Sequence, residues 1–145
     1  TAILVEHCDQ FRRERIAIAL QTFELSWQKR FGTSEGVEKV LRETLIVFGD
    51  EMKSVHAAHT MDGERVENVQ LVGETITPNM MWVYTGDRYR VCDTSFIHEL
   101  IHISLWADGF DRGDPDHLGG DYPGWTEEHN LLLQETNAEL CVLGI

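Results

Sequence analysis

The chain has 145 residues, of which 42% are hydrophobic and 26% charged, and its formal net charge is −13. That length suits one folded domain with a single core, so we expect one domain over residues 1–145. The negative field repels phosphate backbones and argues against nucleic-acid binding. No stretch approaches the roughly 20 apolar residues that a membrane-spanning helix needs. A cationic or neutral partner and a metal cation remain compatible with this charge.

The first third of the chain predicts a strand, a long helix and a second strand. Apolar residues at the start indicate a short buried strand over residues 2–7. From residue 9 to about residue 30, apolar side chains recur every three to five positions, which is typical of a helix. Asp9 is the expected cap at its start, and Gly32 is expected to stop it. Residues 45–48 predict the next strand.

The middle of the chain, over residues 52–92, is predicted to be rich in strands. A turn signal lies at residues 61–64, with isolated apolar positions on the segment that follows. The best strand pattern is residues 81–85, which ends at a glycine and an aspartate.

The last third predicts two helices and a loop between them. The helices cover residues 94–107 and 126–143, and the loop over residues 108–124 is rich in Gly, Asp and Pro. Strands followed by helices indicate an α+β domain. A loop of this length inside a compact domain usually has a function.

The predicted helix over residues 94–107 contains the motif His98-Glu99-Leu100-Ile101-His102. The rest of this helix is apolar on nearly all sides, so we expect it to be buried, and its polar side chains must find partners. Histidines four residues apart share a helix face and can bind one zinc ion. Glu99 follows His98 by about 100° of rotation, beside such a metal without being its ligand. There its carboxylate can take a proton from metal-bound water and return it to a leaving amine.

Through His98-Glu99-x-x-His102 the chain resembles the zincin superfamily of zinc metallopeptidases. The resemblance implies an α+β fold with a small mixed sheet, a long N-terminal helix, the motif helix and a C-terminal helix. It implies one zinc ion bound by His98 and His102, Glu99 as general base, and a peptide or protein substrate. It also implies that a strand before the motif helix, here residues 81–85, holds an extended peptide at its edge. The alternative is a non-catalytic binding domain of zincin fold with a structural zinc.

The third zinc ligand has three candidate sources, because a catalytic zinc usually has three protein ligands and one open position. The first is His117, the histidine of the downstream loop, whose second nitrogen an aspartate could orient. Those aspartates are Asp114, Asp116 and Asp121. The second source, as in the gluzincin branch, is the last helix with Glu127, Glu128, Glu135 and Glu139. The third is Asp108, as in metzincins, although Leu105 stands where that pattern has a glycine.

Two residues are candidates for stabilising the oxyanion of the tetrahedral intermediate. They are Tyr122 in the loop and His129 on the last helix, and packing roles suit both as well.

The cysteines Cys8, Cys92 and Cys141 leave the compartment open. Outside the cytoplasm two of them could form a disulfide and leave one thiol, whereas inside all three could be buried thiols. A secreted or extracytoplasmic location is slightly favoured.

Overall fold

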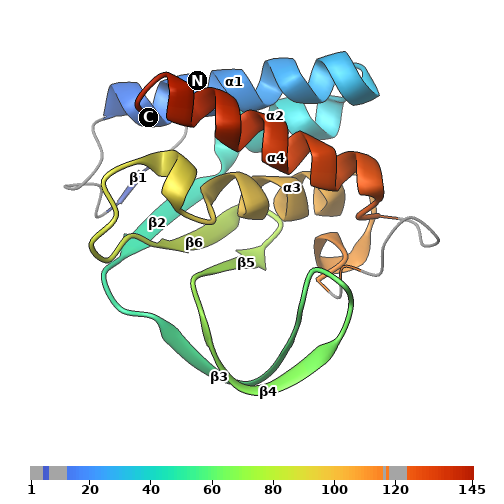
Figure 1. The fold of residues 1–145 in the computed structure, drawn as a ribbon. Helices are drawn as coiled ribbons and strands as arrows, with labels where there is room; N and C mark the ends of the chain where they lie inside the picture. The colour runs from blue at the N-terminus through green and yellow to red at the C-terminus, as the bar shows by residue number, and fades with distance from the viewer. Residues whose placement is uncertain (1–4, 7–12, 116, 118–123) are drawn as a thin grey trace.

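The computed structural model describes residues 5–6, 13–115, 117 and 124–145, and these residues form an α+β fold, as predicted (Figure 1). Helices cover one face of a small mixed sheet, and a long β-hairpin extends on the opposite side of that sheet (Figure 1). Within the described part of the chain, no helix combines the length and apolar character needed to cross a membrane.

The helices and strands follow the predicted order closely. The helices are α1 (Arg13–Phe31), α2 (Glu35–Glu43), α3 (Phe96–Ala107) and α4 (Glu127–Val142), with short 3₁₀ turns η1 (Val91–Asp93) and η2 (Asp111–Gly113). The strands are β1 (Val5–Glu6), β2 (Leu45–Gly49), β3 (Lys53–His59), β4 (Arg65–Leu71), β5 (Gly73–Thr77) and β6 (Met80–Tyr84). The turn predicted at residues 61–64 joins β3 to β4, and Gly32, with a φ of 83°, follows the end of α1. The predicted cap Asp9 lies outside the described residues.

The four-stranded sheet has the order β1-β2-β6-β5. Neighbouring strands are parallel from β1 to β6, whereas β5 runs antiparallel to β6. Because β6 is paired on both sides, the prediction that residues 81–85 offer a free edge to a peptide is wrong. The apolar run of β6 reflects burial at the centre of the sheet. The edge strand on this side is β5, whose alternating polar residues gave no strong strand signal.

Helix α3 is the most deeply buried helix of the fold, as its apolar composition predicted. It lies between the sheet and the other helices (Figure 1). Five of its apolar side chains have no exposed surface: Phe96, Ile97, Leu100, Ile101 and Ile103. The motif carried by α3 is therefore held on a rigid element.

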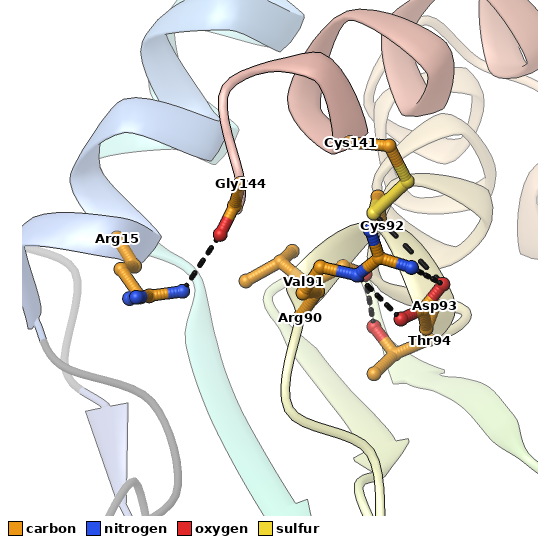
Figure 2. Close-up of a disulfide and its surroundings, with 8 residues drawn as sticks. All are labelled: Arg15, Arg90, Val91, Cys92, Asp93, Thr94, Cys141 and Gly144. Atoms are coloured by element: carbon orange, nitrogen blue, oxygen red, sulfur yellow. Dashed lines mark hydrogen bonds and ion pairs between the residues drawn. A yellow bond between two sulfur atoms is a disulfide. The ribbon is translucent and has the colours of Figure 1, made fainter.

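A disulfide between Cys92 and Cys141 joins η1 to the end of α4 (Figure 2). Beside it Arg15 donates a hydrogen bond of 2.9 Å to the carbonyl oxygen of Gly144, which ties α1 to the same end of α4. The bridged cysteines are 49 residues apart, and constraining a loop of that length contributes about 4 kcal/mol in the chain-entropy model. The disulfide thus secures the segment that leads into α3. Cys8 lies outside the described residues.

Candidate metal centre

The three histidines predicted to bind a metal converge on one point. His98 and His102 project from successive turns of α3, and His117 approaches from the segment after η2. The Nε2 atom of His102 lies 3.1 Å from Nε2 of His98 and 2.8 Å from Nε2 of His117. His102 and His117 are buried, while the His98 side chain keeps 22% of its surface exposed. Among the described residues, His98, His102 and His117 are arranged so that together they could bind one metal ion.

Backbone carbonyl groups determine which nitrogens face that point. The Nδ1 atom of His102 lies 2.6 Å from the carbonyl oxygen of Gly113, and Nδ1 of His117 lies 3.2 Å from that of Thr60. A carbonyl oxygen can only accept, so each Nδ1 carries the proton and donates it. In neutral rings both Nε2 atoms then present lone pairs to each other across 2.8 Å. Facing lone pairs repel, and a cation between them removes the repulsion.

His98 and His102 favour the neutral form that binds metals. Burial, and then the neighbouring imidazoles, hold the pKa of His98 well below its ordinary value. Burial lowers the pKa of His102 to about 3, and the carbonyl of Gly113 opposes this only in part. Neutral imidazoles keep the Nε2 lone pair that a metal needs, so no proton has to be removed before binding at neutral pH.

Gly113 allows the backbone of η2 to approach α3. Its φ is 71°, and a Cβ atom at this position would lie 1.8 Å from the carbonyl oxygen of His102. Only glycine fits both requirements. Its carbonyl can therefore reach the imidazole of His102 and hold the ring in place.

We expect Gly113→Ala to weaken zinc binding about 10- to 100-fold, the usual cost of losing an outer-shell partner of a metal ligand. The added methyl group forces η2 away from α3 and separates the Gly113 carbonyl from His102. Competition with a chromophoric chelator measures the affinity. The control is Gly32→Ala, which imposes the same kind of backbone strain at a φ of 83°. The Cβ atom added there meets no atom within 4 Å. Equal zinc affinities for the two variants would contradict the assigned role of Gly113.

The aspartate that was predicted to orient His117 has a different role. Asp114 accepts a hydrogen bond of 3.1 Å from the backbone N–H of Trp125, which links the segment after η2 to the segment before α4. The carbonyl of Thr60, at the tip of the β3–β4 hairpin, orients His117 instead. Residue types give no signal for a backbone carbonyl, so sequence reasoning missed it. The other two predicted partners lie outside the described residues: Asp116 and Asp121.

Glu99 lies beside the histidine cluster and outside it, as the helix geometry predicted. Its Oε2 atom is 3.9 Å from Nε2 of His98, and the hydroxyl of Thr75 on β5 donates to Oε1 over 3.1 Å. Gly73 makes room for this carboxyl group, because a Cβ there would lie 2.8 Å from Oε2. Burial raises the pKa of Glu99 to about 8, with the Thr75 hydroxyl opposing and Glu74 adding to the rise. A nearby divalent cation would favour the carboxylate.

The alternative third ligands are all engaged elsewhere or exposed. Glu128 and Glu135 both pair with Arg30 of α1 at 2.5 Å. Asp108 accepts a hydrogen bond of 2.8 Å from the hydroxyl of Ser34. The remaining two glutamates of α4 have exposed side chains: Glu127 and Glu139. Glu128 and Glu135 therefore face α1 rather than the histidines.

The candidate oxyanion stabiliser His129 has a structural role in α4. Its Nδ1 atom accepts a hydrogen bond of 3.0 Å from the backbone N–H of Thr126, which caps the helix. Its ring stacks on Phe31 with centroids 4.4 Å apart. The other candidate, Tyr122, lies outside the described residues.

Trp125 is a site residue that sequence reasoning did not identify. It is fully buried, and its ring centroid lies 5.0, 4.7 and 5.1 Å from those of His98, His102 and His117. The indole therefore supplies an apolar side to the cluster and excludes water from that side.

A cavity of about 1290 Å³ opens onto the cluster. Residues of α3 and β5 line it, among them His98, Glu99 and Thr75, and the β3–β4 hairpin contributes apolar side chains, namely Val55, Ala57 and Leu71. Its volume exceeds what a single ion requires.

Comparisons with protein families, with curated proteins and with solved structures give no match to this chain. Function must therefore be inferred from the chemistry of the site itself.

Proposed function

We propose that this protein is a zinc-dependent peptidase with a zincin-like fold. His98, His102 and His117 would hold one zinc ion, and Glu99 would be the general base. The observation that carries the proposal is the convergence of the Nε2 atoms of these three histidines, at separations of 2.8 and 3.1 Å. Around a tetrahedral zinc with Zn–N bonds of about 2.1 Å, nitrogens lie roughly 3.4 Å apart, so a small adjustment of the rings suits this metal.

Zinc supplies Lewis acidity, which polarises a carbonyl group and lowers the pKa of water. The protein's own contribution is proton transfer by Glu99, next to the cluster but outside its ligand set. The Thr75 hydroxyl holds Oε1, which leaves Oε2 to accept a proton from the attacking water and pass it to the leaving amine. The low exposure of Glu99, 5%, keeps bulk water from competing for that proton.

The edge strand β5 supports a peptide as the substrate. It lies against α3, since Thr75 contacts Glu99, and none of the described strands pairs with its outer side. An extended peptide can add to such an edge through backbone hydrogen bonds and present a scissile amide to the cavity. The disulfide between Cys92 and Cys141 supports an oxidising compartment as the place of action.

A catalytic zinc is favoured over a structural one by the number of ligands. Structural sites are closed by four ligands. The cluster found among the described residues has three, and the cavity opens beside it. Substrate access to the metal is therefore available.

The test is cleavage of a peptide pool by the purified protein, with product sequences read by mass spectrometry. We expect defined internal cleavages by protein loaded with one zinc per chain, and none by the same protein after chelation. Restored cleavage on adding zinc back would exclude a contaminating enzyme of another class. Full zinc occupancy without cleavage of any peptide would rule out the peptidase proposal and leave a zinc-binding domain.

A further inference from the structure

The cavity wall beside the histidine cluster carries a cation, the guanidinium of Arg112. Arg112 of η2 lines the cavity together with His102 and His117, and its side chain is exposed. It immediately precedes Gly113, whose carbonyl oxygen lies 2.6 Å from Nδ1 of His102. The backbone that carries the guanidinium is thus tied directly to a proposed metal ligand.

The described residues that line the cavity include one more cation, Arg88, which lies over the ring of Tyr84 at 4.8 Å. Within the part of the chain that the structure describes, Arg112 makes no ion pair or side-chain hydrogen bond. Its guanidinium is therefore available to a ligand in the cavity.

The backbone at Arg112 is also held in a restricted conformation. Its φ is 55°, in the left-handed region that few residues other than glycine adopt. Such a conformation costs free energy and persists where the surroundings impose it. Here the close approach of Gly113 to α3 accompanies it, and the backbone that carries Arg112 is held at the cavity wall.

We propose that Arg112 binds a carboxylate of the substrate and makes the enzyme selective for peptides with an acidic group near the scissile bond. This inference rests on the proposed peptidase function. A guanidinium presents parallel N–H donors that match the two oxygens of a carboxylate. The carboxylate can belong to an acidic side chain or to the C-terminus of the peptide. Because the overall charge repels acidic peptides at long range, this selectivity must come from local contact.

The test compares zinc-loaded wild type with Arg112→Gln on matched peptides. Their sequence is that of the most rapidly cleaved peptide in the pool, with Glu or Gln at each position around the cut, and with a free or amidated C-terminus. In one of these pairs, we expect the wild-type kcat/KM to be about tenfold higher for the acidic peptide than for its neutral counterpart. This factor is at the low end for a hydrogen bond to a charged group, because Arg112 is exposed. The pair that shows the difference identifies the source of the carboxylate.

Arg112→Gln should abolish that preference while the zinc content stays at one ion per chain. The matched control is Lys39→Gln, which removes the same charge from an exposed position on α2 and should keep the preference. Cleavage without an acidic preference in wild type, or a preference that survives in Arg112→Gln, would overturn this inference. The proposed peptidase function would still stand. Failure of zinc-loaded wild type to cleave any peptide would overturn both.

Discussion

Replacing Glu99 by Gln should leave one zinc per chain and lower the rate of peptide cleavage on the order of 10²- to 10⁴-fold, the usual contribution of a general base. The amide has nearly the same shape as the carboxyl group, and its oxygen can still accept the hydrogen bond from Thr75. It cannot accept a proton from water at neutral pH. The change therefore removes proton transfer without disturbing the three histidines, and kcat/KM on a quenched peptide measures the loss.

The matched control is Glu139→Gln, which removes one carboxylate from the exposed side of α4. This variant should keep both the zinc and the rate, because Glu139 lies outside the described histidine cluster. Full activity in Glu99→Gln would contradict the assignment of the base. Loss of zinc in that variant would instead make Glu99 part of the metal site.

The features of the site that are local in sequence could be predicted, and the reason is helix geometry. Four residues make roughly one turn, so His98 and His102 must share a face once α3 forms. The apolar composition of α3 also showed that this face would be buried. His117 could be named because it is the histidine of the downstream loop, although the loop's path was not predictable.

The features that depend on distant backbone groups could not be predicted. The Thr60 carbonyl orients His117 from a hairpin tip 57 residues away in sequence, and every residue type offers the same group. The edge position of β5 depends on how the strands pair. We expected the more apolar segment, now β6, to offer the edge, but an apolar run is typical of a strand buried inside a sheet, whereas an edge strand such as β5 is more polar. Likewise, Glu128 and Glu135 of α4 were candidate metal ligands by their place in the sequence, but both pair with Arg30 of α1.

The third ligand can be decided by His117→Ala, which we expect to reduce zinc affinity more than the 10- to 100-fold that outer-shell substitutions cost. Two histidines on one helix turn cannot hold a tetrahedral ion alone. The carboxylates considered as alternative third ligands are either engaged with other residues or exposed. His102→Ala should behave in the same way. His56→Ala is the control, since His56 is exposed on β3 and should leave affinity unchanged.

Thermal unfolding gives an independent measure of the same substitution. A ligand that binds only the folded state at 100 times its Kd stabilises that state by about 2.7 kcal/mol, so zinc should raise the Tm of the parent and of His56→Ala. The shift should vanish in His117→Ala at the same zinc concentration. If His117→Ala kept both the zinc and the shift while His102→Ala lost them, the third ligand would have to come from another residue. The hydrogen bond between His117 and the hairpin would then be only a structural contact, and the facing Nε2 atoms would need a different explanation.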